Sequence, residues 1–285
     1  MIYHLIIMSN TSDFIKILFI GDIFGLPGIV TIEKYLKGIV KEHNIDYVIA
    51  QGENVTGRKG LNETDYIRLK KAGINFFTMG NHVWANSDIE KIINNPDIVR
   101  PYNIENGYPG EGTRIVNIKN FTLRITSMMG ITFNELRYPW EQNTANSFIS
   151  AADILVNNTK KTDFSLIDFH GETTSEKYVF GLHVDGYVDA VVGTHTHVQT
   201  NDDHILENGT CYITDVGMTG PIDSAIGARV KEVKSKITNP RSKEKFYISS
   251  NNTQLNAVKI TLYKDGIKNK KNTIEKINFF NLKIY

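Results

Sequence analysis

The stretch "KILFIGD" at residues 16–22, followed by "LPGIVTIEKYLKGIVKEHN" at residues 26–44, decides the fold. The first is a short apolar run rich in β-favouring residues, and it stops at Gly21. The second carries apolar residues at the spacing of an amphipathic helix. This order predicts a strand, a loop and a covering helix.

The same order recurs twice along the chain. "DYVIAQGEN" (residues 46–54) precedes a segment that opens a helix near Asn62, and "NFFTMGNH" (residues 75–82) precedes one that opens near Asn86. Asparagine is a favoured residue at helix N-termini. Repeated alternation of strands and helices predicts an α/β sheet covered by helices.

The second half of the chain continues the pattern less regularly. We expect a hairpin from residues 114–118 and 123–126, an irregular loop over residues 128–145 and a helix over residues 147–158. Strand-like runs follow in "FSLIDFH", "YVDAVVG", "TCYITDVG" and "LNAVKITLY", with a short helix in "TSEKYVFGL". No internal repeat or linker divides the chain, so we expect a single domain over residues 15–285, preceded by an N-terminal extension, residues 1–14.

The composition suits one domain with a large core, because 41% of the 285 residues are apolar. With 32 basic and 31 acidic side chains, the whole chain has no overall charge that would attract nucleic acid or a membrane. The charge is unevenly distributed: residues 229–285 hold 14 basic and 4 acidic side chains, whereas residues 1–228 hold 18 and 27. This asymmetry is compatible with binding of an anionic substrate or RNA, but solvated basic faces that pair with an acidic body are the simpler interpretation.

A single cysteine, Cys211, excludes an intramolecular disulfide. A packed, unreactive thiol in a reducing compartment is therefore expected. No apolar run reaches the roughly 18 residues needed to cross a bilayer, and residues 1–8 lack the basic start and cleavage site of a signal peptide. We expect a cytoplasmic protein with no membrane partner.

Polar side chains follow each apolar strand of the predicted sheet. In open α/β sheets the carboxyl ends of the strands border the ligand crevice, so these side chains should converge. They are Asp22, Glu53 with Asn54, Asn81 with His82, His170, and His195 with His197. Carboxylates, amides and imidazoles together form a mixed nitrogen and oxygen set suited to divalent transition metals. The sequence therefore predicts a metal site.

The histidine pair in "VVGTHTHVQT" (residues 191–200) is the strongest local feature. If this segment is extended, alternate side chains share a face. Both His195 and His197 would then point to one side at the mouth of a strand.

Each candidate also has a simpler interpretation when taken alone. Asp22 and Asn81 are residues that commonly form turns or cap helices. A lone His170 is more often a hydrogen-bonded core histidine than a metal ligand. Glu53, between glycine and asparagine just past a buried strand, is a poor turn former, which leaves a ligand role open. The metal interpretation rests on the coincidence of five strand ends.

A pair of metal ions would define the chemistry of such a site. Ions about 4 Å apart, bridged by a carboxylate, hold a hydroxide between them and clamp phosphoryl oxygens during an in-line displacement. Glu53 is the natural bridge. The leaving alkoxide needs a proton, which an imidazole near the ions, but not bound to them, can supply. We therefore expect Asn81 to bind metal and its neighbour His82 to act as the general acid.

The motifs "GD", "GEN", "GNHVW", a lone histidine and "GTHTH", in this order, resemble those of the calcineurin-like metallophosphoesterases. That family typically carries D-x-H, G-D, G-N-H, H and G-H-x-H. This sequence has Phe24 in place of the first motif's histidine, and Glu53-Asn54 in place of the bridging aspartate and its follower. Both differences, together with "ILFIGDIFGLPG", "DFHGETTSEK" and "YITDVGMTGP", resemble the YmdB-type branch, bacterial cytoplasmic phosphodiesterases of the same superfamily. The likeness runs from about Lys16 to the C-terminus.

The resemblance implies a fold, a ligand set and an activity. The implied fold is a four-layer α-β-β-α sandwich of metallophosphoesterase type, with two central mixed sheets flanked by helices. One ion would be held by Asp22, Glu53, Asn54 and His197, with Asn54 replacing the histidine absent at Phe24; the other would be held by Glu53, Asn81, His170 and His195. The two divalent or trivalent ions would be iron or manganese, with zinc or magnesium also compatible. The implied activity is hydrolysis of 2',3'-cyclic nucleotides or related phosphodiesters.

Other polar residues have less distinctive contexts. Residues 174–176 most simply cap the following helix, the alternative being that they shape the substrate site. Asp168 and Asp215 either orient ligand histidines or make plain structural hydrogen bonds. Residues 58–59 are basic and either neutralise substrate charge or are surface-exposed, and His204 is a loop residue within reach of a phosphate.

Competing functions stay open. The same fold would suit a phosphomonoesterase or nucleotidase. A non-catalytic regulator that binds a nucleotide or RNA is a second alternative, although a mere binder needs no proton donor such as His82. Two metal ions could also hydrolyse a non-phosphate ester or amide. We rank this alternative last, because the order of the motifs resembles that of phosphoesterases. The sequence leaves open the physiological substrate, the native metals and whether the chain forms a homo-oligomer.

Overall fold

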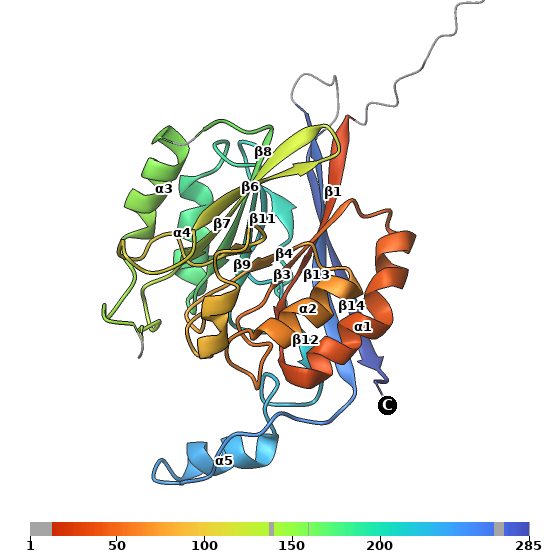
Figure 1. Cartoon of the computed structure of the whole chain (residues 1–285), viewed down its shortest axis with the longest axis vertical. Helices are drawn as coiled ribbons and strands as arrows, with labels where there is room; N and C mark the ends of the chain where they lie inside the picture. Colours follow the sequence, from red (N-terminus) through yellow and green to blue (C-terminus); the bar gives the residue numbers. More distant parts are fainter. Residues whose placement is uncertain (1–12, 137–139, 159, 265–270, 285) are drawn as a thin grey trace, which may run out of the picture.

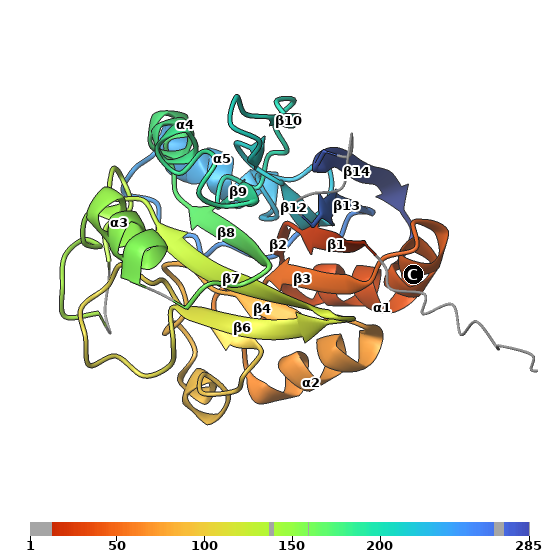
Figure 2. The same ribbon diagram turned by 90° about the horizontal axis from the view of Figure 1, so that it is seen from above.

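The computed structural model describes residues 13–136, 140–158, 160–264 and 271–284. Over these residues the chain forms two mixed β-sheets that pack face to face, with helices on their outer faces (Figures 1 and 2). The predicted four-layer α-β-β-α sandwich is confirmed. The expected N-terminal extension lies outside the described residues except for Asp13 and Phe14, and Phe14 is already the first residue of β1.

The first sheet has eight strands in the order β2-β12-β13-β1-β3-β4-β5, and β14 pairs with β13 off this path. The run from β1 through β3 and β4 to β5 is parallel, whereas β13 is antiparallel to each of its partners. The strands are β1 (Phe14–Ile20), β2 (Asp22–Ile23), β3 (Tyr47–Gln51), β4 (Phe76–Thr78), β5 (Ile98–Val99), β12 (Met218–Pro221), β13 (Thr253–Tyr263) and β14 (Thr273–Leu282).

The second sheet has six strands in the order β10-β11-β9-β8-β7-β6. Its four central strands, β11, β9, β8 and β7, are parallel, and each edge strand is antiparallel to its neighbour. The predicted hairpin is confirmed as β6 and β7. The strands are β6 (Thr113–Ile118), β7 (Phe121–Met129), β8 (Phe164–His170), β9 (Ala190–Thr194), β10 (His204–Ile205) and β11 (Cys211–Ile213).

Two pairs of helices form the outer layers. Helices α1 (Gly25–Glu42) and α2 (Glu63–Ala72) cover the first sheet, and α3 (Phe148–Asn158) and α4 (Thr174–His183) cover the second (Figures 1 and 2). Asn62 is the N-cap of α2, as predicted, because its side chain accepts a hydrogen bond from Asp65 N at 2.7 Å.

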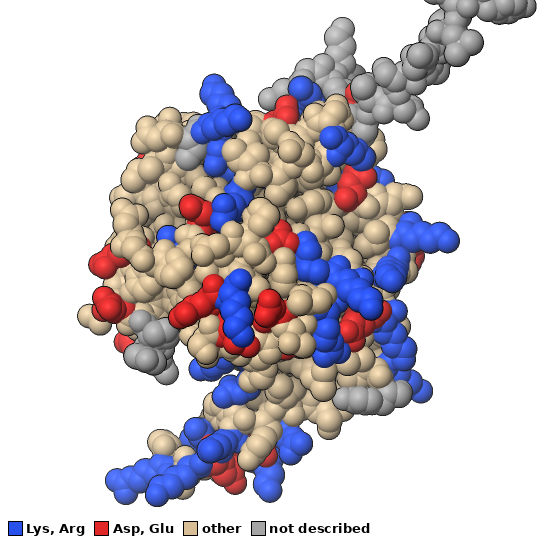
Figure 3. Space-filling model, viewed as in Figure 1, with Lys and Arg blue, Asp and Glu red and all other residues tan. Residues whose placement is uncertain are grey.

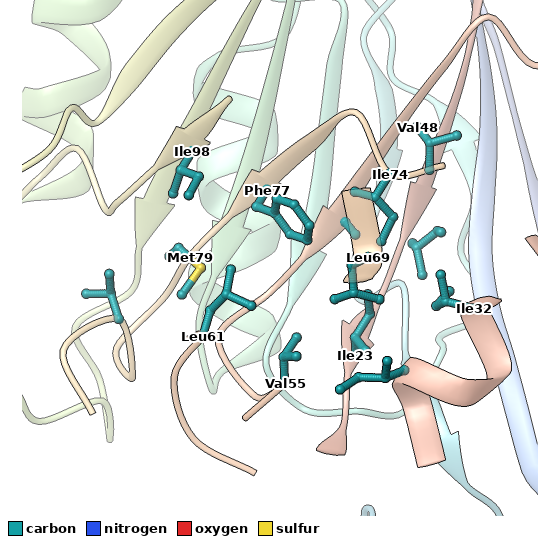
Figure 4. Packing of buried hydrophobic residues seen from close by; sticks show 14 of the residues in the cluster. Ile23, Ile32, Val48, Val55, Leu61, Leu69, Ile74, Phe77, Met79 and Ile98 are labelled. Atoms are coloured by element: carbon teal, nitrogen blue, oxygen red, sulfur yellow. The ribbon is translucent and has the colours of Figure 1, made fainter. Parts of the chain in front are cut away.

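The alternation within β1 shows why the sequence builds four layers. Ile15, Ile17 and Phe19 belong to the apolar core between the two sheets, whereas Leu18 and Ile20 belong to the core under α1 and α2. A strand buried on both faces in this way reads as a continuous apolar run. Figure 4 shows part of the core under α1 and α2, in which side chains from the first sheet pack against those of the helices. A third core lies between the second sheet and its helices α3 and α4.

Two segments differ from the sequence-based expectation. The segment after Asn86 forms only a 3₁₀ helix, η1 (Ser87–Lys91), although Asn86 caps it as predicted by accepting a hydrogen bond from Asp88 N. Pro96 follows closely and disfavours helical backbone in the residue before it, which limits the length of this helix. In the lysine-rich region, a further helix that was not predicted, α5 (Val230–Thr238), projects from the body of the molecule (Figure 1).

The basic side chains of the C-terminal region are partly concentrated on that projection. Figure 3 shows Lys and Arg side chains clustered at the projection, while the body carries both signs of charge. Cys211 is buried in β11, as expected for an unreactive thiol. Among the described residues, no helix is both long enough and apolar enough to span a bilayer.

Candidate metal centre

The polar residues predicted from the strand ends come together at the carboxyl edges of both sheets. Asp22, Glu53 with Asn54, and Asn81 with His82 follow β1, β3 and β4 of the first sheet. His170 ends β8, and His195 and His197 follow β9 of the second sheet. Hydrogen bonds or close polar contacts join all eight side chains in one network. The candidate site therefore spans the two sheets.

Glu53 lies at the centre of this network and is fully buried. Its Oε1 atom lies 3.1 Å from His170 Nε2 and 3.2 Å from His82 Nδ1, and its Oε2 accepts the backbone N–H of His82 at 2.9 Å. Burial alone would raise the pKa of Glu53, but the charges of His170 and His82 outweigh it and hold that pKa well below its ordinary value. Glu53 is therefore a carboxylate that faces two imidazoles.

Glu53 belongs to a compact group of three side chains whose potential ligand atoms lie close together. Glu53, His170 and His195 each place one nitrogen or oxygen within 4.8 Å of the other two, the only such group of three acidic, His or Cys side chains among the described residues. The Oδ1 atom of Asn81 lies 3.1 Å from His170 Nε2, so its oxygen already faces this group. The structure thus brings together the four residues of the second expected ligand set.

The other expected ligand set gathers around the side-chain amide of Asn54. Its Nδ2 atom lies 3.1 Å from Asp22 Oδ1, 3.3 Å from Glu53 Oε1 and 3.3 Å from His197 Nε2. His197 Nε2 is 3.6 Å from Asp22 Oδ1. Only the amide oxygen of Asn54 can bind a metal. The side-chain amide must therefore rotate so that its oxygen takes the place of its nitrogen, and this is feasible because the two groups have nearly the same shape. The residues of this set are assembled, with Asn54 in the orientation that donates.

The outer nitrogen of each histidine has an acceptor, which fixes the nitrogen left for a metal. His195 Nε2 lies 2.9 Å from Glu172 Oε2, and His197 Nδ1 lies 3.0 Å from Ile226 O. These contacts place a hydrogen on each outer nitrogen. His195 Nδ1 and His197 Nε2 therefore carry the free lone pairs that point into the network.

His170 has the same arrangement through a hydroxyl group. Its Nδ1 lies 2.9 Å from Thr194 Oγ1, and that hydroxyl donates to Asp168 Oδ1 at 2.7 Å. Because the Thr194 hydroxyl donates its proton to Asp168, its oxygen accepts a hydrogen bond from His170 Nδ1. This contact is shorter than the 3.2 Å distance from Gln51 Nε2 to the same nitrogen. His170 Nε2 is thus the nitrogen that faces Glu53. Asp168 reaches His170 only through Thr194.

The charges of the site favour a cation. Burial lowers the pKa of His170, but the carboxylates of Glu53, Asp22 and Asp168 outweigh it and raise that pKa to about 9. The same carboxylates would attract a metal ion in place of the proton. Gly80 leaves the necessary space, because a Cβ atom there would lie 2.3 Å from His170 Cδ2 and 2.4 Å from Glu53 Oε2. The buried donors and this open backbone fit a transition-metal centre.

The backbone around His195 and His197 corrects the expectation of an extended segment. β9 ends at Thr194, and both histidines adopt the left-handed region, with φ of 103° for His195 and 65° for His197. They do not share one face: His195 contacts His170, whereas His197 contacts Asp22 and Asn54. The two imidazoles therefore contact different members of the network, and both residues have left-handed backbone.

Phe24, which stands where the resembled motif has a histidine, packs beside the site. Its buried ring packs edge to face against His197, with ring centroids 5.4 Å apart. Phe24 thus contributes packing where a histidine would contribute a ligand atom.

Several weaker expectations are resolved differently. Thr173, before the predicted group, caps α4 by accepting the N–H of Glu176, and the Glu176 carboxylate binds residues 131–132. Arg58 lies over the ring of Phe246, and His204 is exposed in β10. Glu172 was missed by sequence reasoning, although an acidic residue two positions after a strand-end histidine was a usable signal.

Comparisons with known proteins identify the family of this chain. A family model described as YmdB-like protein matches residues 18–277. The chain is 38% identical over 248 residues to the 2',3'-cyclic-nucleotide 2'-phosphodiesterase of Bacillus subtilis, covering 87% of this chain and 91% of that protein. It is 40% identical over 253 residues to a Mycoplasma genitalium protein described as phosphatase/phosphodiesterase, covering 86% and 87%. The crystal structure of a novel phosphatase from Mycoplasma pneumoniae superimposes with a TM-score of 0.83 at 36% identity, covering 93% of each chain.

Proposed function

Because this chain belongs to the YmdB-like family, we propose that it is a metal-dependent phosphodiesterase that hydrolyses 2',3'-cyclic nucleotides or related phosphodiesters. The observation that carries the proposal is the network of eight side chains centred on Glu53, with lone pairs of three histidines directed into it. The name of the Bacillus subtilis relative supports the substrate class.

The proposed ligands divide into two sets that share Glu53. Besides Glu53, one set comprises Asp22, Asn54 and His197, and the other comprises Asn81, His170 and His195; Asn54 and His170 both contact Glu53 Oε1. When bound, a pair of metal ions supplies charge stabilisation for the phosphoryl oxygens and an activated water. The nitrogen and oxygen donor set suits iron or manganese, with zinc or magnesium also compatible.

His82 is the proposed general acid. Its side chain is 26% exposed, at the open side of the network, and its Nδ1 faces Asn54 Oδ1 and Glu53 Oε1 at 3.2 Å. Glu53 Oε1, which remains an acceptor when the Asn54 amide is rotated for metal binding, places a hydrogen on Nδ1, so Nε2 is the atom that passes a proton to the leaving alkoxide. The backbone N–H of His82 also donates to Glu53, which fixes the position of the acid relative to the proposed bridge.

The experiment that tests this proposal compares substrates and metals. Purified protein, depleted with a chelator and then supplied with Mn²⁺ or Fe²⁺, is assayed on 2',3'-cyclic AMP, bis-p-nitrophenyl phosphate and p-nitrophenyl phosphate. We expect activity on both diesters that disappears with the chelator and returns with the metal. Equal activity with and without metal would contradict the proposal.

A phosphomonoesterase is the second candidate, because two relatives have phosphatase in their names. The same assay separates the two functions. A preference for p-nitrophenyl phosphate over the bis compound would favour the phosphatase. A pure binding protein would turn over none of the three substrates.

A further inference from the structure

Behind the turn that carries His195 and His197 lies a buried ion pair. Lys177 Nζ, from α4, is 2.7 Å from Asp215 Oδ2, and each of these two side chains is only 1% exposed. Neither residue belongs to the proposed ligand sets or to the proposed proton transfer. The cost of desolvating two buried charges offsets much of their attraction, so a stabilising effect alone is a weak explanation for such a pair. Its hydrogen-bond partners indicate a more specific role.

Asp215 binds the residue that separates the two histidines. Its Oδ2 accepts the backbone N–H of Thr196 at 3.0 Å and the hydroxyl of the same residue at 2.8 Å. Its Oδ1 accepts the N–H of Gly217 at 2.8 Å. Thr196 is therefore fixed at both its backbone and its side chain.

The peptide on either side of Thr196 needs such fixing. His195 and His197 both have φ in the left-handed region, which residues other than glycine adopt at an energetic cost. Strained backbone of this kind persists only when the surrounding structure determines it. Relaxation of either residue to ordinary backbone would turn its imidazole away from the network described above.

Lys177 compensates the charge of the buried Asp215 carboxylate. Without a cation, Asp215 would be an uncompensated charge in the interior. The path of the lysine side chain depends on Gly193, because a Cβ atom there would lie 3.0 Å from Lys177 Cδ and 1.8 Å from Thr214 O. The glycine of the "GTHTH" motif thus lets the lysine pass behind the histidine turn.

We propose that Lys177 and Asp215 are positioning residues that hold Thr196 so that His195 and His197 each present one imidazole to a different metal ion. This inference rests on the proposed function, since the metal roles of the two histidines belong to it. The competing explanation is that the pair only stabilises the fold, in which case its loss would lower stability and leave metal affinity unchanged.

The test measures Mn²⁺ binding to the metal-depleted protein by titration calorimetry, without substrate. Asp215→Asn keeps the shape of the side chain and removes its charge. Asp185→Asn is the matched control, because Asp185 is also buried and accepts two backbone N–H groups, from Asn208 and Thr210, in a turn that carries no proposed ligand. We expect Asp215→Asn to weaken Mn²⁺ binding by about 10- to 100-fold and Asp185→Asn to leave it within about twofold.

A second pair of variants keeps the test decisive if Asp215→Asn does not fold. Thr196→Val removes the hydroxyl bond to Asp215, and Thr196→Ser retains it. We expect Thr196→Val to bind Mn²⁺ more weakly and Thr196→Ser to bind it with nearly wild-type affinity. The melting temperatures of the two metal-free variants should be similar. Unchanged affinity in Thr196→Val and in folded Asp215→Asn would overturn the inference. Failure of the wild-type protein to bind Mn²⁺ or Fe²⁺ would instead overturn the proposed function.

Discussion

His195 Nδ1 lies 2.9 Å from His170 Nε2, and the two imidazoles meet edge to face although 24 intervening residues separate them. Their outer nitrogens are already hydrogen-bonded, so two lone pairs would face each other unless a proton or a cation lies between them. Burial and the charge of His170 lower the pKa of His195 to about 3, while the carboxylates raise that of His170 to about 9. The pair is therefore built around one shared positive charge.

Removal of the proposed acid should reduce turnover and spare metal binding. We expect His82→Ala to lower kcat on 2',3'-cyclic AMP by about 10² to 10⁴, because the leaving alkoxide must depart without a proton. The loss should be smaller on bis-p-nitrophenyl phosphate, whose leaving group is a weaker base. Metal content by plasma mass spectrometry should equal that of wild type. The control is His183→Ala, which alters a half-exposed histidine of α4 that pairs with Asp153 of α3, and an equal loss there would refute the assignment.

Replacement of the proposed bridge should affect both metal ions. Glu53→Gln keeps the size of the side chain but removes the charge that lies beside His170 and His82. We expect Mn²⁺ affinity to fall at least about 100-fold and the bound metal to fall from two ions to one or none. Equilibrium dialysis measures both quantities. Glu207→Gln changes an exposed glutamate and should retain two ions; two tightly bound ions in Glu53→Gln would argue against a bridge.

Two glycine-to-alanine changes should shift stability in opposite directions. Gly38 lies in α1 with open space around an added Cβ, so Gly38→Ala should raise the free energy of unfolding by about 0.5–1 kcal/mol. At Gly193 an added Cβ would lie 1.8 Å from Thr214 O, a backbone atom, so Gly193→Ala should lower it by about 1–3 kcal/mol. Urea unfolding followed by circular dichroism measures both. A neutral Gly193→Ala would mean that β9 and β11 separate more easily than their packing indicates.

The single thiol should stay unreactive until the protein unfolds. Burial raises the pKa of Cys211 from 9.0 to about 12. Because this pKa is higher in the folded state, the stabilisation it reflects is complete below pH 9 and declines as the pH rises from about 9 to about 12. Labelling with a thiol reagent at pH 8 should be slow in buffer and fast in urea. Rapid labelling of the folded protein would show that β11 opens locally.

The sequence predicts the location of the site better than its internal geometry. Apolar runs that end in polar residues mark strand ends, and parallel strands bring those ends to one edge of a sheet, so Asp22 could be grouped with Glu53 from spacing alone, whereas His170 comes to them from the second sheet. The left-handed turn at His195 and His197 could not, because φ depends on contacts made by Asp215, a residue distant in the chain.

Other features could not be predicted from the sequence for related reasons. Lys177 falls in a short helix and looks like a solvent-facing lysine until the tertiary structure buries it against Asp215. β12 and β14 join the first sheet through antiparallel pairing with β13, and such pairing depends on partners far along the chain rather than on local pattern. Likewise, α5 packs little of its surface, and only Glu232 in it is buried.

The proposed ligands come from both sheets: Glu53 and Asn81 from the first, His170 and His195 from the second. Bound ions would thus act as cross-links between the two sheets, and ligands that bind only the folded chain protect it from unfolding. A cell short of the metal would lose more than turnover. Each polypeptide would open more often, expose the apolar layer between the sheets and be degraded sooner, so metal supply would set the lifetime of the protein as well as its activity.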